Sequence, residues 1–159
     1  MSQEEKIKES LISKFNFLGD AINLVRPRRI SIEVNQDNFL PVFVYLAREL
    51  QFSHLCTITG LDEQERLGFI YHLAGEQGVM INLKTGVPKS DPVIKTVTQY
   101  FPGAEIYERE LVDLFGAEVE GLPAGNRYPL TDDWPTDQHP LRKDWKAGPD
   151  TDKGVVENA

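Results

Sequence analysis

The chain has 159 residues, of which 40% are hydrophobic and 26% charged, and a net charge of −8 at neutral pH. This length and composition are typical of one soluble globular domain that buries about two-thirds of its unfolded surface. The negative charge argues against generic nucleic-acid binding and against direct adhesion to anionic lipid, because both need a positive surface. The single cysteine, Cys56, excludes an internal disulfide and fits a reducing compartment.

Neither a membrane span nor an export signal is expected. The longest apolar run, residues 39–47, contains Pro41 and falls far short of the about 20 residues that a spanning helix needs. The first five residues lack the basic region followed by an apolar stretch that marks a signal peptide. Any contact with a membrane is therefore expected to run through a partner protein, without direct insertion.

The first half of the chain predicts a helix, a strand and a second helix. Apolar residues recur every three or four positions across residues 4–17, and Gly19 is suited to end that helix. Residues 30–34 alternate between apolar and polar, as in a half-buried strand. Asp37 or Asn38 is expected to cap the next helix, with Pro41 in its first turn, where a missing N–H costs little.

Three strands are expected next, followed by two helices. The strands are residues 54–59, 67–73 and 78–84, and the glycine-flanked run 75–78 predicts a hairpin turn between the last two. A short helix is expected over residues 90–101, and a charged helix over residues 104–115. We therefore predict an α+β fold in which one mixed or antiparallel sheet of about four strands is covered by helices.

Beyond Gly116 the regular periods fade, and the remaining stretch holds five of the ten prolines and both tryptophans. Such a stretch does not sustain a helix or a central strand. We divide the chain into an α+β domain, residues 1–116, an extended docking tail, residues 117–145, and a disordered C-terminus, residues 146–159.

The helix over residues 104–115 carries charge around an apolar arc. Tyr107, Leu111 and Phe115 fall on the core side of the helical wheel, together with Leu114. On the opposite side Arg109 and Asp113, four residues apart, are expected to pair. From the pattern alone, this face is either solvated with one ion pair or a protein interface.

The polar residues also offer alternative chemical roles. Glu108, Glu110 and Asp113 are poor candidates for a metal or acid–base cluster, because no histidine lies near them in sequence and Arg109 would compete for the carboxylates. Cys56 and His54 project to the same side of one strand and are the nucleophilic pair that a small independent enzyme would use, although a strand cysteine is more often a buried hydrophobe. No glycine-rich phosphate loop is present.

The tail segment 134–145 is either a loop folded onto its own domain or an arm that pairs with another protein. Tryptophan and arginine dominate interface hot spots, and a segment with few internal contacts gains order when a partner supplies them. A free-standing adaptor outside energy metabolism would also fit these features.

Two motifs carry a family resemblance. Residues 108–116 read Glu-Arg-Glu-x-x-Asp-x-Phe-Gly. Residues 139–144 read His-Pro-Leu-Arg-Lys-Asp and follow an acidic residue and a tryptophan, Asp133-Trp134. In this order and spacing, residues 102–145 resemble the thirty-kilodalton subunit of respiratory complex I, which is the C subunit of the bacterial NADH–quinone oxidoreductase, and its relatives in energy-converting membrane-bound nickel–iron hydrogenases. The run 121–129 echoes the family pattern only at Gly121, Pro123 and Arg127, which favours a hydrogenase-type or otherwise divergent member.

The resemblance implies a structural subunit without a cofactor or catalytic residues of its own. It would lie on the cytoplasmic side of the cell membrane, against the large hydrogenase-like subunit and the adjacent iron–sulfur subunit. Iron–sulfur clusters, and nickel–iron or quinone sites, would belong to those partners, and the chain would support electron transfer coupled to ion translocation. The residues expected at the partner interface are Glu108, Arg109, Glu110, Asp113, Phe115, Gly116, Arg127, Trp134, His139, Leu141, Arg142, Lys143 and Asp144.

Overall fold

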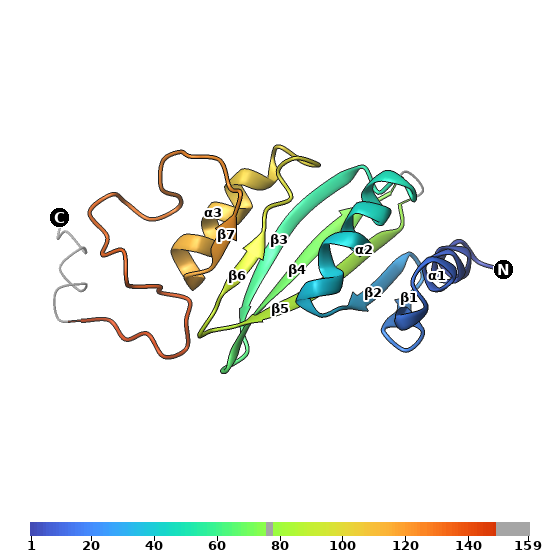
Figure 1. Cartoon of the computed structure of the whole chain (residues 1–159), viewed down its shortest axis with the longest axis horizontal. Helices are drawn as coiled ribbons and strands as arrows, with labels where there is room; N and C mark the ends of the chain where they lie inside the picture. The colour runs from blue at the N-terminus through green and yellow to red at the C-terminus, as the bar shows by residue number, and fades with distance from the viewer. Residues whose placement is uncertain (76–77, 149–159) are drawn as a thin grey trace, which may run out of the picture.

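The computed structural model describes residues 1–75 and 78–148 (Figure 1). Part of the expected hairpin turn and most of the expected disordered C-terminus lie outside these residues. The helices and strands are α1 (Gln3–Lys14), the 3-10 turn η1 (Asn16–Leu18), β1 (Ile22–Arg26), β2 (Arg29–Glu33), α2 (Gln36–Arg48), β3 (His54–Asp62), β4 (Arg66–Ala74), β5 (Met80–Pro88), β6 (Val93–Lys95), α3 (Ala104–Phe115) and β7 (Glu118–Glu120).

Local sequence explains where the first two helices begin. Ser2 accepts a hydrogen bond from the backbone N–H of Glu5, and the Glu5 carboxylate accepts one from the Ser2 backbone, which completes a capping box. Asn35, and not the expected Asp37 or Asn38, caps α2 by accepting from the Asn38 backbone N–H at 3.0 Å. Because the helix begins at Gln36, before the expected caps, Pro41 is its sixth residue and lies in the second turn, not in the first turn as expected.

The main sheet has five strands in the order β1-β2-β5-β4-β3. The β2–β5 pair is parallel and the other pairs are antiparallel, so the expectation of a mixed sheet in an α+β fold is confirmed. The expected count of about four strands omitted β1, because only the first of its five residues is buried and the strand shows no apolar alternation.

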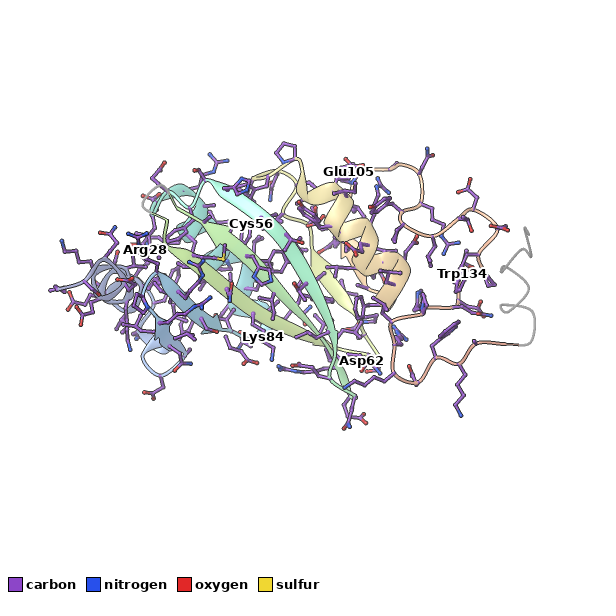
Figure 2. The ribbon with its side chains drawn as sticks, turned by 180° about the vertical axis from the view of Figure 1, so that it is seen from behind. Arg28, Cys56, Asp62, Lys84, Glu105 and Trp134 are labelled. Atoms are coloured by element: carbon purple, nitrogen blue, oxygen red, sulfur yellow. The ribbon has the colours of Figure 1, made fainter. Side chains whose placement is uncertain are left out.

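An aromatic core joins α2 to one face of this sheet. The rings of Phe39 and Tyr71 lie 4.6 Å apart, and that of Phe43 lies 5.6 Å from each of them. Figure 1 shows α2 crossing in front of β4 and β5, and Figure 2, seen from behind, places the strands in front of α2. The helix α2 therefore covers the apolar face of the sheet.

The expected helix over residues 90–101 is wrong. Its residues form β6, which pairs in parallel with β7, and then a series of turns. The β-branched residues Val93 and Ile94 favour a strand once a partner is in place, and that partner lies more than 20 residues further along the chain. Pairing over this distance overrides the local helical spacing.

The charged helix α3 is confirmed at the expected residues. Gly116 ends it with a left-handed backbone, φ 68°, which glycine adopts without strain. The helix packs beside β3, where a Cβ added to Gly60 would lie 2.4 Å from the Phe115 ring. Gly60 thus sets how closely α3 approaches the sheet. No helix in the described part of the chain is long and apolar enough to cross a membrane.

Candidate functional site

The charged helix α3 contains a glutamate, Glu108, that is fully buried. Its carboxyl group accepts hydrogen bonds from the Thr96 hydroxyl at 2.6 Å and from the Val97 backbone N–H at 2.7 Å. Burial raises the pKa of this carboxyl group, although both hydrogen bonds act in the opposite direction. Glu108 therefore ties α3 to the segment after β6 and presents no surface to a partner.

Asp113 also faces inward, toward the tail. Its Oδ1 accepts from the Arg127 Nε at 3.1 Å, and its Oδ2 accepts from the Leu130 backbone N–H at 3.1 Å. The expectation that Arg109 pairs with Asp113 is wrong. The Arg109 guanidinium pairs instead with the Glu105 carboxylate, one turn toward the helix start, at 2.7 Å. Glu at position i and Arg at i+4 is the favourable orientation on a helix, and Asp113 is held on another face.

The tail is anchored at the C-terminal end of α3. The His139 ring nitrogen Nδ1 donates to the Asp113 backbone carbonyl at 2.9 Å, and the Leu141 backbone N–H donates to the Leu114 carbonyl at 3.1 Å. The Arg142 guanidinium donates to the Phe115 carbonyl at 2.6 Å. These donors satisfy carbonyls that the helix end leaves unpaired, so the tail acts as a cap for α3.

Asp62, at the end of β3, is a second anchor, and it is not among the residues expected at the partner interface. Its Oδ2 accepts from the Lys143 backbone N–H at 2.7 Å and from the Lys89 Nζ at 2.8 Å, and its Oδ1 accepts from the Gln64 backbone N–H at 2.8 Å. Burial alone would raise the pKa of Asp62, but these donors outweigh it and hold the pKa at about 2. The tail is therefore fixed to the sheet as well as to α3.

This anchor predicts a specific loss of stability in acid. The Asp62 pKa falls from 3.8 to about 2 on folding. The ionised Asp62 should therefore contribute its full share to the free energy of unfolding above pH 3.8, and this share should be lost as the pH falls toward 2. After solvent screening, the loss should be about 1 to 2 kcal/mol. Denaturant unfolding of wild type and Asp62→Asn at pH 7 and pH 2 measures this. The difference between the two proteins should shrink in acid, and a difference that is independent of pH would contradict the assignment.

The two tryptophans hold the middle of the tail together. Their rings lie 6.0 Å apart. The Trp134 Nε1 donates to the Gln138 carbonyl at 2.9 Å, and the Trp145 Nε1 donates to the Gln138 side chain at 3.3 Å. In the described residues the tail thus makes more contacts with itself and with the body than its proline-rich sequence indicated. Figure 1 shows it looping beside α3 at the end of the molecule away from α1.

The surface that remains exposed is a mixture of apolar and charged groups. Leu141 is 52% exposed, Ile106 46% and Tyr128 45%. Lys143 and Asp144 are also exposed, whereas Glu110 is half-buried. Ile106 and Tyr128 line one hollow together with Arg109 and Arg127, between α3 and the tail. Neither Ile106 nor Tyr128 was among the residues expected at the interface, because neither belongs to the two matched motifs. The position of Ile106 outside the apolar arc of the helical wheel is the one sequence signal of its exposure.

The alternative chemical sites gain no further support. Within residues 1–75 and 78–148 no hydrogen bond joins Cys56 to His54, and β3 has an irregularity in its pairing between Leu55 and Thr57. The Cys56 carbonyl accepts from the Tyr107 hydroxyl at 3.0 Å, so this stretch of β3 holds α3 in place. The described residues hold no group of three or more His, Cys, Asp or Glu side chains that could bind a metal ion.

Known proteins are similar to this chain in sequence and in fold. The family model described as "Respiratory-chain NADH dehydrogenase, 30 Kd subunit" matches residues 32–151. The chain is 34% identical over 146 residues to the C subunit of F(420)H(2) dehydrogenase from Methanosarcina mazei, covering 90% of this chain and 92% of that protein. It is 34% identical over 146 residues to the C subunit of NADH-quinone oxidoreductase from Roseiflexus castenholzii, covering 89% of this chain and 79% of that protein.

Two solved structures are similar to this chain in fold. A chain in the structure of the membrane-bound sulfane sulfur reductase, an archaeal respiratory membrane complex, superposes with a TM-score of 0.80 at 27% identity, covering 97% of this chain and 92% of that chain. A trypsin-resistant fragment of Nqo5 superposes with a TM-score of 0.64 at 26% identity, covering 76% of this chain and 98% of that chain. The family model and the relatives confirm the resemblance read from residues 102–145, and the chain belongs to the family of the 30 Kd subunit of the respiratory-chain NADH dehydrogenase.

Proposed function

We propose that the chain is a cofactor-free subunit in the peripheral arm of a complex I-like membrane oxidoreductase, on the cytoplasmic side of the membrane. It docks against the large catalytic subunit and the adjacent iron–sulfur subunit and holds them in register. Electron transfer and coupled ion translocation would depend on it, while the iron–sulfur clusters and the quinone or nickel–iron site would belong to its partners. Membership of the hydrogenase type, which the departure in residues 121–129 favours, stays a prediction.

The observation that carries this proposal is the ordered tail along α3, with exposed apolar residues on its outer side. Backbone and buried side-chain contacts fix the tail, while Leu141 projects more than half of its surface into solvent. Large apolar side chains held outward on a fixed segment are typical of a docking surface.

The proposed interface residues fall into two groups. Glu108, Asp113 and Phe115 are buried and would act by positioning α3 and the tail. The remaining members are partly or fully exposed residues and are proposed to meet the partners, together with Ile106 and Tyr128, although the Arg109 and Arg127 side chains keep only 14% and 16% of their surface exposed. These remaining members are Arg109, Glu110, Gly116, Arg127, Trp134, His139, Leu141, Arg142, Lys143 and Asp144.

Leu141→Asp should impair assembly while leaving the fold intact. The side chain is 52% exposed, so the isolated variant should melt within about 2 °C of wild type. In the complex, the new carboxylate would be buried without a partner, at a cost of about 2 kcal/mol or more. Recovery of the complex from membranes measures this, with Leu141→Met as the apolar control. Normal recovery of Leu141→Asp would place the docking surface elsewhere.

A further inference from the structure

A second candidate surface lies at the opposite end of the molecule, on the edge strand β1. The sheet has two edges, β3 and β1. The β3 edge is covered by α3, whose Tyr107 donates to the Cys56 carbonyl. The β1 strand pairs with β2 on one side, and in the described chain no other strand pairs with it. Figure 1 shows α1 beside β1, where Lys8 donates to the Ile22 carbonyl at 3.3 Å, while the later residues of the strand remain exposed.

This edge is apolar as well as unpaired. After Ile22 every residue of β1 is exposed, with Leu24 at 41% and Val25 at 64%. Native proteins usually protect such an edge with proline, inward-pointing charge or a covering element, because free N–H and C=O groups recruit other strands. Within β1, residues 23–25 carry neither charge nor proline. An edge of this kind is a template for an added strand.

The junction of β1 and β2 is strongly basic in an acidic chain, with Arg26 at the end of β1, Arg28 in the turn and Arg29 at the start of β2. Arg26, Arg28 and Arg29 lie within four positions, whereas the whole chain has a net charge of −8. None of the three guanidinium groups takes part in an ion pair in the described residues. Glu4 accepts from the Arg28 backbone N–H, and the Arg29 guanidinium donates to the Arg28 carbonyl. Because the Glu4 carboxylate also interacts with Arg28 through its charge, Arg26 and Arg29 are the cations most available to a carboxylate-bearing ligand.

We propose that the β1 edge takes up an extended acidic segment of a neighbouring subunit as an additional strand of the sheet. The segment's backbone would satisfy the free groups of β1, its apolar residues would cover Leu24 and Val25, and its carboxylates would pair with the arginines at the turn. This inference rests on the proposed function, because it requires that the chain work inside a complex.

Charge and geometry favour this occupant over two others. A second copy of the chain, paired antiparallel through β1, would set each arginine cluster against the start of the other β1, where Asp20 is the single carboxylate in residues 20–25. An anionic lipid surface would attract the arginines but would not pair with a row of backbone N–H and C=O groups. An acidic strand satisfies the backbone, the apolar residues and the cations at once.

The position of β1 separates this surface from the docking surface on α3 and the tail. The family model matches from residue 32 onward, so β1 and the three arginines precede the matched region. Figure 2 shows Arg28 and Trp134 at opposite ends of the molecule. With both surfaces occupied, the chain would bridge two neighbours that do not otherwise need to touch.

Site-specific photo-cross-linking in the intact complex tests the proposal. A benzophenone-bearing phenylalanine analogue replaces Val25, with exposed Glu49 at the end of α2 as the control position. After irradiation, mass spectrometry should identify one acidic segment of another subunit cross-linked at position 25. Arg26→Glu should lower that yield at least tenfold, whereas Lys95→Glu, a matched charge reversal on the exposed end of strand β6, should not. Cross-links to lipid or to a second copy, or none above the Glu49 control, would overturn the proposal.

Cross-linking from a third position shows whether the edge-strand proposal fails alone or together with the proposed function. The same photoreactive residue at Leu141 reports on the surface beside α3. Cross-links at 141 without any at 25 would overturn the edge-strand proposal alone. The absence of cross-links to any subunit at both positions would overturn the proposed function as well.

Discussion

Gly60→Val should destabilise the protein by about 3 kcal/mol, because it drives α3 away from the sheet. A Cβ at position 60 would lie 2.4 Å from the Phe115 ring, and valine adds two further methyl groups in the same space. Thermal melting of the purified variant measures the effect, with a fall of about 6 to 12 °C expected for a chain of this size.

Two controls make the Gly60→Val result specific. Gly19→Val introduces the same side chain where an added Cβ meets nothing within 4 Å, and it should melt close to wild type. Gly60→Val combined with Phe115→Ala should lose much less than the sum of the two single variants, because the alanine vacates the contested space. Equal melting of the two glycine variants would contradict the close approach of α3 to β3.

Asp113→Ala should cost about 3 kcal/mol and loosen the tail. The substitution removes the acceptor of the Leu130 backbone N–H and strands the Arg127 guanidinium, which is mostly buried beside it. Melting measures the stability, and hydrogen exchange measures the tail, where protection of residues 127–134 should fall while that of β5 persists.

Asp132→Ala is the matched control for Asp113→Ala, since Asp132 is an exposed aspartate in the same tail. It should leave both melting and exchange nearly unchanged. Pairing Asp113→Ala with Arg127→Ala should recover part of the loss, because no unpaired charge remains. Wild-type exchange in Asp113→Ala would show that the tail is held by its other anchors alone.

Elements with strong local periods could be predicted from the sequence. The helices α1, α2 and α3 and the strands β2 to β5 follow apolar spacing that the fold then uses, so the α+β class followed from them. The short strands β1, β6 and β7 could not be predicted in this way. The strands β6 and β7 are three residues each and pair with each other across more than 20 residues, whereas β1, although it forms a hairpin with β2, buries only one of its five residues.

The candidate site was harder to predict because its charges are partnered by distant residues. On a helical wheel Asp113 looks solvent-facing and Glu108 lies at the edge of the apolar arc, yet both are buried, Glu108 against Thr96 and Asp113 against Arg127. Asp62 and Lys143 are 81 positions apart and meet only in the folded chain. A period of 3.6 residues reports which face of α3 is apolar, but not which polar groups another segment will cover.

The most direct test of the central claim is purification of the tagged chain from native membranes, followed by mass spectrometry. We expect the large catalytic subunit and the iron–sulfur subunit to co-purify in stoichiometric amounts with the wild type and with Leu141→Met, and to be lost with Leu141→Asp. Iron should accompany the intact complex and not the separated chain. Recovery of the wild-type chain alone, or equal recovery of both partners with Leu141→Asp, would contradict a docking role for the surface beside α3.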